Sequence, residues 1–288
     1  MLVLTEETLR LSARVEELLV AHNPRGMARL RPQLVPGYCA RAAKQLWDFR
    51  DRTILIGTGF PVSNTFETDG PAGAMALYDA LECLGANVWI AGPPSLAAVL
   101  APTHQVLALH AAHAREQQRH CEESLGRIKP DLIIAIEVPG AAADGHYYNI
   151  RGIDISAQCG NFESFIKTQG CPTIGIGDGG NEAGMGNISA IAADLPIKQA
   201  VGRCNELVIA DVSNWGAYAL VGFLGHWAKQ SFLQDLRQRP ILEWLSEHGA
   251  VDGVTHQRTA TEDGLSLGSG NLVIDALVKV FNTEKDTQ

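Results

Sequence analysis

One short segment combines carboxylates, amides and bare backbone. IGIGDGGNEAGMGN, residues 174–187, follows an apolar run and places Asp178, Asn181 and Glu182 among six glycines. Glycine lets a backbone approach a ligand closely, and Asp, Asn and Glu offer the oxygen atoms that hard divalent cations prefer. We therefore expect Asp178 and Glu182 to be catalytic and to hold a divalent cation, Mg²⁺ or Mn²⁺, while Gly179, Gly180 and Asn181 contact the substrate. A glycine-rich turn with solvated acids is the structural alternative.

The same segment contains a literal GxGxxG at Gly175, Gly177 and Gly180. In a dinucleotide site these glycines lead into a helix whose N-terminus receives the pyrophosphate. Here Asp178 lies inside the motif and Glu182 follows it, so a pyrophosphate would meet negative charge. We expect no nucleotide cofactor. A nucleotide-dependent α/β enzyme that uses loop 175–186 stays open as an alternative.

A second loop, IEVPGAAADGHYYNIRGIDIS, begins where an apolar strand ends. Glu137 stands at that point, and a buried carboxylate is costly without a partner, which indicates a catalytic base or a metal ligand. Further along, Tyr148, Asn149 and Arg151 are expected to contact the substrate, because Arg can clamp a carboxylate through two parallel hydrogen bonds. A Glu137–Arg151 salt bridge and tyrosines packed as wall residues are the alternatives.

The third loop, GTGFPVSNTFETDGPAGA at residues 57–74, leaves a strand and enters a helix whose free N–H groups could bind an anion. Asp69 has a structural alternative, as a side-chain acceptor at that helix start. The expected substrate contacts in this loop are Thr58, Gly59, Glu67, Asp69 and Gly70.

Strands and helices alternate along the chain in a way that explains where these loops lie. Continuously apolar runs predict strands at 52–57, in ANVWIAGPP, and at 131–137, 171–176 and 206–211. Between and after them, helices are predicted from Pro71 to a C-cap at Gly85 and near 111–127, 161–169 and 214–229. This order predicts an α/β fold with a mostly parallel sheet, helices on both faces, and an active site at the carboxyl ends of the strands.

Residues 1–50 are predicted to form an N-terminal helical segment packed on an α/β body at 51–288. Because no Pro- or Ser-rich linker separates the two, we expect one structural unit. The 288 residues are 46% hydrophobic and carry a formal charge of −9, which disfavours nucleic acid and anionic membrane surfaces as partners.

The acidic residues near the N-terminus argue against a signal or transit peptide, so a cytoplasmic protein is expected. The six scattered cysteines are expected to be free thiols. A small molecule is the expected partner, and the oligomeric state, including a homo-oligomer, stays open.

Taken together, these strings resemble the D-glutamate cyclase family, which is also seen as the C-terminal domain of a larger vertebrate mitochondrial protein. The resemblance rests on NPRG at 23–26, on GTGF and ETDGPAGA, and on the two loops that contain Glu137 and Asp178. It implies a lyase of the hydro-lyase type that converts D-glutamate, an amino-acid substrate, to 5-oxo-D-proline with loss of water. Composition and spacing do not show this reaction.

The chemistry that the resemblance implies assigns provisional roles. Arg151 is expected to hold the α-carboxylate, and Glu137 to take a proton from the ammonium group. Asp178 and Glu182 are expected to hold the cation at the γ-carboxylate. A non-catalytic protein that binds a small acid in the same cleft is a further alternative.

Overall fold

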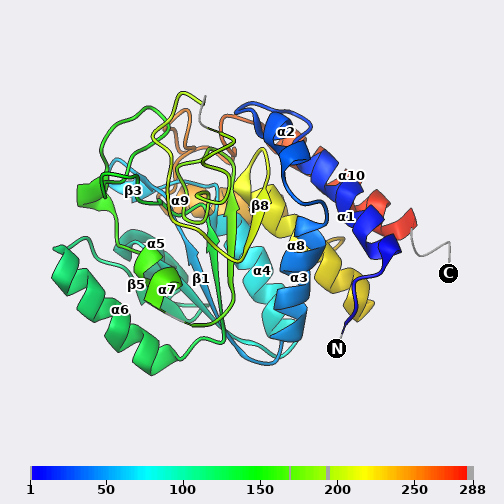
Figure 1. Ribbon diagram of the computed structural model, residues 1–288, viewed down its shortest axis with the longest axis horizontal. Helices are drawn as coiled ribbons and strands as arrows, with labels where there is room; N and C mark the ends of the chain where they lie inside the picture. The colour runs from blue at the N-terminus through cyan, green and yellow to red at the C-terminus, as the bar shows by residue number, and fades with distance from the viewer. Residues whose placement is uncertain (1, 169, 193–194, 284–288) are drawn as a thin grey trace.

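The computed structural model describes residues 2–168, 170–192 and 195–283 (Figure 1). A six-stranded sheet forms its centre, with all neighbouring strands parallel and in the order β5-β4-β1-β6-β7-β8. This confirms the predicted α/β fold. The strands are β1 (Thr53–Thr58), β4 (Asn87–Gly92), β5 (Val106–Ala108), β6 (Leu132–Ile136), β7 (Thr173–Gly177) and β8 (Glu206–Ile209).

Side chains on the two faces of the sheet pack into two separate cores. Leu55 of β1 packs into one core and its neighbours Ile54 and Ile56 into the other. The same alternation holds in β6, where Ile133 and Ile134 belong to opposite cores. Because both faces of the sheet are covered, the strands read as unbroken apolar runs in the sequence.

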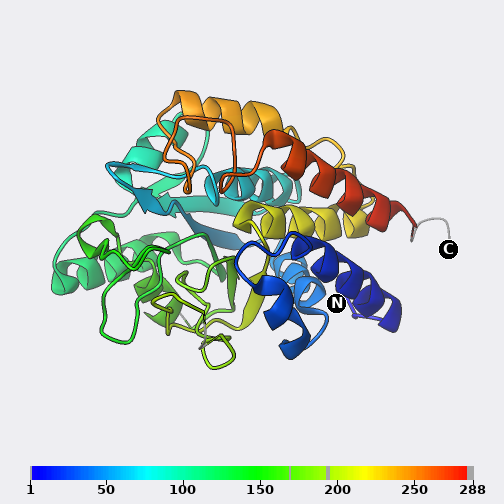
Figure 2. The ribbon, with the colours of Figure 1, turned by 90° about the horizontal axis from the view of Figure 1, so that it is seen from above.

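Helices cover both faces, as Figure 2 shows from above. The smaller core holds residues of α6 (Ala114–Ile128) and α7 (Glu163–Thr168); position 169 of the predicted helix lies outside the described residues. The larger core is built on α4 (Pro71–Cys83), α5 (Pro94–Leu100) and α8 (Ser213–Ala228). α8 is buried continuously from Ser213 to Gly225 because further helices pack outside it.

Those outer helices come from both ends of the chain. α1 (Glu6–Leu19), α2 (Met27–Leu30) and α3 (Tyr38–Asp48) belong to the same core as α8, and α1 lies against α10 (Leu267–Thr283). A buried carboxylate fixes α1 to the start of α3: Glu16 accepts hydrogen bonds from Ser12 Oγ at 2.7 Å and from the Cys39 amide at 3.1 Å. The first fifty residues thus pack on the α/β body through a shared core.

Several elements have no counterpart among the predicted ones, and α9 and α10 among them are full helices of 10 and 17 residues. They are β5, α5, the 3₁₀ turn η1 (Arg31–Gln33), the hairpin of β2 (Pro61–Val62) and β3 (Thr65–Phe66), the turn η2 (Ser156–Gln158), α9 (Gln238–Glu247) and α10. Two-residue strands and single turns carry too little periodicity to be read from sequence. Among the described helices, none combines the length and the apolar character that crossing a bilayer requires.

The strand order also determines where a ligand can bind. β1 and β6 are neighbours, but the chain continues from β1 to β4 on one side and from β6 to β7 on the other. In a doubly wound sheet the loops leaving such a pair separate and open a crevice at the carboxyl ends. The loops that follow β1, β6 and β7 are the three that the sequence singled out.

Candidate active site

One cavity of about 280 Å³ is lined by all three loops. Glu67 comes from the loop after β1, Glu137 from the loop after β6, and Asp178 from the loop after β7. The predicted convergence of these loops is therefore confirmed. Of the expected site residues, the cavity wall includes Glu67, Glu137, Asn149, Arg151, Asp178, Gly179, Asn181 and Glu182.

Glu137 is buried in a strained position at the carboxyl end of β6. It follows β6 directly, and its backbone adopts φ of 47°, a left-handed conformation that few non-glycine residues use. Such strain costs on the order of 1–3 kcal/mol and is commonly found at functional sites. Ser213 Oγ donates a 2.6 Å hydrogen bond to Glu137 Oε2 and fixes the carboxyl group. Gly70 packs so tightly here that a Cβ on it would lie 2.7 Å from Glu137 Cβ.

Asp69 lies between the N-termini of two helices. Its Oδ1 accepts hydrogen bonds from the Gly70 and Asn214 amides at 2.8 and 2.7 Å, and its Oδ2 accepts one from the Ser213 amide at 2.9 Å. These amides belong to the starts of α4 and α8, where backbone N–H groups lack partners within the helix. These contacts match the structural alternative, in which Asp69 is a side-chain acceptor at a helix start. Asp69 is not among the residues of the cavity wall.

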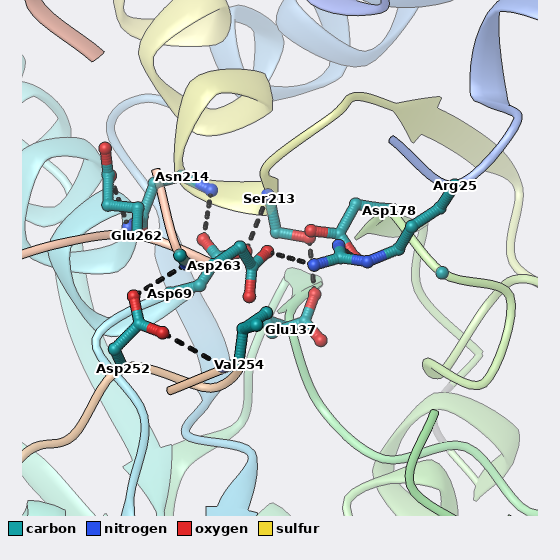
Figure 3. A network of polar contacts seen from close by, with 12 residues as sticks. Arg25, Asp69, Glu137, Asp178, Ser213, Asn214, Asp252, Val254, Glu262 and Asp263 are labelled. Atoms are coloured by element: carbon teal, nitrogen blue, oxygen red, sulfur yellow. Dashed lines mark hydrogen bonds and ion pairs between the residues drawn. The ribbon is translucent and has the colours of Figure 1, made fainter. Parts of the chain in front are cut away.

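Arg25 is a site residue that the sequence analysis missed. Its Nη1 lies 2.5 Å from Asp178 Oδ1 and its Nη2 lies 2.7 Å from Asp263 Oδ2, so one guanidinium group joins two carboxylates (Figure 3). The side chain comes from the turn between α1 and α2, in which Asn23 and Gly26 have positive φ. The only sequence signal was the turn-like string NPRG, and nothing local connects it with loops more than a hundred residues away.

The C-terminal loop before α10 supplies a second missed group. Asp263 contacts Arg25, and the adjacent Glu262 accepts side-chain hydrogen bonds from Asn214 at 2.8 Å and Trp215 at 3.2 Å. Asp252 shapes this loop by accepting from the Val254 and Gly264 amides at 3.0 and 2.8 Å, among other donors. In the sequence these acids cannot be distinguished from solvated loop carboxylates, because they follow no predicted strand.

The buried carboxyl groups hold their protons more tightly than free ones. Burial, together with the nearby charges of Asp178 and Glu182, raises the pKa of Glu137 well above its usual range. Burial likewise raises the pKa of Glu67, with Asp263 adding to the effect. The pKa of Asp263 is raised to about 7 by burial, although Arg25 opposes this. A cluster of this kind can hold and exchange protons near neutral pH.

Arg25 stays charged in this environment. Burial alone would lower its pKa, but the carboxylates of Asp178 and Asp263 outweigh that effect and the pKa is raised. The pKa of Asp178 is raised by burial and lowered in part by Arg25. The cavity therefore combines one buried positive charge, that of Arg25, with carboxyl groups whose pKa values are raised.

Glu182 lines the cavity and also accepts hydrogen bonds within its own turn. Its two carboxylate oxygens accept hydrogen bonds from the Gly179 and Gly180 amides at 2.8 and 2.7 Å. The carboxylate thereby closes its own glycine-rich turn, in which Gly180 has φ of 110°. The neighbouring Asn181 donates from Nδ2 to the Tyr148 carbonyl at 3.0 Å and ties this loop to the preceding one.

Several expected substrate contacts lie away from the cavity wall. Thr58 and Gly59 line a smaller adjacent cleft, because the chain turns at Gly59 toward Pro93. Tyr148 donates its hydroxyl hydrogen bond to Asp144 at 2.8 Å, with Lys198 Nζ 5.1 Å from its ring centre. Asp69, Gly70 and Gly180 support the wall from behind without being part of it.

Arg151 lies at the cavity without a carboxylate partner among the described residues. Its Nη2 donates to the Val254 carbonyl at 3.1 Å, and the side chain is exposed. No ion pair joins it to Glu137 in the described part of the chain, so the salt-bridge alternative fails. The guanidinium group remains accessible to a ligand.

Three carboxylates lie close enough together to hold a metal ion. One oxygen each from Asp69, Glu137 and Asp178 lies within 4.8 Å of the others. Asp178 Oδ2 is buried, and no N–H or O–H group of the described residues donates to it. A cation, or a proton shared with a neighbouring carboxyl group, would satisfy this atom. Glu182, expected beside Asp178 as a ligand, is not in this group.

The GxGxxG string lacks the context that a dinucleotide site needs. Gly175 and Gly177 lie inside β7, and the described residues from there to β8, 178–192 and 195–205, contain no helix. The loop therefore provides no helix N-terminus for a pyrophosphate.

Comparison with known proteins agrees with the resemblance drawn from the loops. A family model described as D-glutamate cyclase-like, C-terminal, matches residues 15–278. The human protein "D-glutamate cyclase, mitochondrial" is 33% identical over 203 residues, which make up 59% of this chain and 32% of that protein. The chain thus spans about a third of the length of this relative. The crystal structure of gox2181 aligns with 73% of this chain and 72% of its own at 13% identity, and its TM-score of 0.28 supports no argument.

Proposed function

The chain belongs to the D-glutamate cyclase-like family, and we propose that it is an enzyme that cyclises D-glutamate to 5-oxo-D-proline with loss of water. The observation that carries this proposal is the combination, in one cavity, of Arg25 with the buried carboxyl groups of Glu67, Glu137, Asp178 and Asp263. A substrate with one ammonium and two carboxylate groups needs both kinds of charge.

The proton balance of the reaction explains why such a cluster suits it. The α-nitrogen attacks the γ-carboxyl carbon, an N–C bond forms, and one C–O bond breaks. Two protons leave the ammonium group, and both end on the departing oxygen, which becomes water. No net proton, electron or phosphate is consumed. The enzyme therefore has to bring the ends of one molecule together and pass protons between them.

Glu137 is suited to accept the ammonium proton. A carboxylate with a raised pKa is a stronger base than a free one, and that of Glu137 is raised by burial and by neighbouring charge. Its hydrogen bond from Ser213 holds one oxygen in place. Asp263, with its pKa near 7, is suited to protonate the leaving oxygen.

The two arginines have separate roles in this proposal. Arg25 is fixed by two carboxylates at the base of the cluster, where it stabilises the negative charge that develops on the γ-carboxyl oxygen. Arg151 retains free guanidinium N–H groups at the rim and binds the α-carboxylate there. This arrangement folds the substrate so that its two ends meet.

A divalent cation is compatible with the donor set. Asp69, Glu137 and Asp178 would hold it through carboxylate oxygens, the ligands that Mg²⁺ and Mn²⁺ prefer. Such an ion would polarise the γ-carboxyl group as a Lewis acid.

The test is direct conversion. The purified protein is incubated with D-glutamate or L-glutamate, with and without Mn²⁺, and 5-oxoproline is measured by chiral chromatography. We expect 5-oxo-D-proline from the D enantiomer and loss of activity in Glu137→Gln. Absence of conversion in both directions, starting from glutamate and from 5-oxoproline, would contradict the proposal. Thermal shifts with D-glutamate, NAD and ATP then distinguish a binding protein from a nucleotide-dependent enzyme.

A further inference from the structure

Glu262 is fully buried, yet the residues that line the cavity do not include it. Its carboxyl group receives three side-chain N–H groups: Asn214 Nδ2 at 2.8 Å on one oxygen, and Trp215 Nε1 at 3.2 Å and Gln238 Nε2 on the other. An ionised carboxylate can only accept hydrogen bonds. Glu262 is therefore one of the groups that hold the Asn214 amide with Nδ2 toward it.

The orientation of Asn214 matters because both ends of its amide are used. Its Oδ1 accepts from the Gly70 and Gly73 amides at 2.9 and 2.7 Å, while Nδ2 also donates to the Thr68 carbonyl at 3.1 Å. In a flipped amide, Nδ2 would face two N–H donors and Oδ1 would face two acceptors. Asn214 thus joins the start of α8 to the start of α4 in only one orientation.

This contact between the starts of α8 and α4 holds residues of the carboxyl cluster in place. The Asn214 backbone amide binds Asp69 at 2.7 Å, and the segment just before Gly70 also carries Glu67 of the cavity wall. Gly70 packs on Glu137, where even a methyl group would lie 2.7 Å from Cβ. A shift of this segment would therefore move Glu67 and disturb the packing against Glu137.

We propose that Glu262 is a positioning residue that acts through the Asn214 amide to hold the segment of Glu67 and Asp69 against Glu137. The inference rests on the proposed cyclisation. Because a displacement of about 1 Å at reacting groups can cost 100-fold in rate, the effect belongs in kcat more than in KM.

The experiment compares three variants. Glu262→Met removes every acceptor, and kcat should fall about 10-fold or more with KM changed less than about 3-fold. Glu262→Gln keeps an oxygen that can face Asn214, so its kcat should lie within about 3-fold of wild type. Gln238→Met is the matched control, because it removes a partner of Glu262 without touching Asn214, and it should leave kcat within about 3-fold.

Coupling with Asn214 separates positioning from general destabilisation. In an Asn214→Leu background, Glu262→Met should lower kcat no further, since the group through which it acts is gone. An additive loss in the double variant, or a Glu262→Met kcat at the wild-type level, would overturn the proposal. If Glu262→Met does not fold, Glu262→Asp, whose shorter carboxylate cannot reach all three donors, is judged by the same criteria.

Hydrogen exchange at the Gly70 and Gly73 amides keeps this proposal separate from the cyclisation itself. Glu262→Met should lower their protection while Gln238→Met leaves it unchanged. If wild-type protein does not cyclise glutamate, the proposed function fails, and the exchange rates still decide the role of Glu262. Unchanged protection in Glu262→Met would refute that role.

Discussion

The Arg25 guanidinium lies 2.5 Å from the Asp178 carboxylate, although one residue comes from a turn between the first two helices and the other follows β7. The pair brings the N-terminal helices into the site at the carboxyl ends of the sheet. Arg25 also contacts Asp263, so a single side chain links three distant segments of the chain. Its removal should affect both folding and chemistry.

Arg25→Met is expected to lower the free energy of unfolding by about 3–5 kcal/mol, because it leaves buried carboxylates without their cation. Arg25→Lys keeps the charge but cannot span two carboxylates as a planar guanidinium does. We expect Arg25→Lys to be folded and to cyclise glutamate at least about 10-fold more slowly. Urea denaturation and initial rates measure the two effects. Wild-type stability in Arg25→Met would show that neither carboxylate is charged when Arg25 is absent.

The strand-to-helix loops were predictable because their signals are local. Apolar runs that end in glycine and carboxylates placed Glu137 and Asp178 at the carboxyl end of a parallel sheet, and the structure brings them to one cavity. Arg25 and Asp263 were missed because neither follows a predicted strand, and only the packing of α1 and α10 against the body brings them near.

Glu182 shows a different limit of sequence reasoning. Its residue type and its place among glycines were compatible with metal binding, whereas its carboxylate in the structure accepts hydrogen bonds from the turn's own amides. A carboxylate that binds a cation and one that caps its own backbone look the same in a sequence. The conformation of the turn decides whether its amides reach the carboxylate, and the residue types of the turn alone do not reveal that conformation.

Gly70→Ala should be far more damaging than Gly85→Ala, although both glycines have φ near 100°. At Gly70 the new methyl group would lie 2.7 Å from Glu137 Cβ and from Thr58 Oγ1, whereas at Gly85 no atom lies within 4 Å. We expect a loss of about 3 kcal/mol or more for Gly70→Ala and about 1 kcal/mol for Gly85→Ala. Thermal denaturation of the two variants measures this difference. Equal losses would show that backbone strain alone, and not the contact with Glu137, requires the glycine.

Stability should fall as the pH rises from about 4.5 to 7. Burial raises the pKa of Glu262 from 4.5 to about 7, so within this window the folded state binds more protons than the unfolded state. The free energy of unfolding then decreases with pH, and above pH 7 this residue adds no further slope. In Glu262→Gln the slope of the unfolding free energy against pH should be less steep, by at most the contribution of one bound proton. Urea unfolding at several pH values measures the slope, and parallel curves for the two proteins would argue against this titration.

Arg151→Lys tests substrate binding at the rim. The side chain is exposed and makes one hydrogen bond to the Val254 carbonyl, so the melting temperature should change little. A lysine cannot form the bidentate contact, and KM for D-glutamate should rise about 10-fold. Arg258→Lys, an exposed arginine in a neighbouring loop outside the cavity wall, is the control. Unchanged kinetics with a lowered melting temperature would assign Arg151 to stability.

Asp178→Asn and Glu182→Gln, two changes of equal chemical size, should have different consequences. Glu182→Gln places an amide N–H₂ against a backbone N–H in the glycine turn, which should cost about 1–3 kcal/mol of stability. Asp178→Asn leaves Asp263 as an ion-pair partner of Arg25, so the protein should stay folded and lose less stability than Arg25→Met. It should lower kcat by about 100-fold, and it should also abolish any thermal stabilisation by Mn²⁺ if Asp178 binds the ion with Asp69 and Glu137. Melting curves with and without Mn²⁺, measured beside initial rates, separate the two variants. If Glu182→Gln instead loses the Mn²⁺ response at wild-type stability while Asp178→Asn keeps it, the cation is bound by Glu182 and the assignment to Asp178 is wrong.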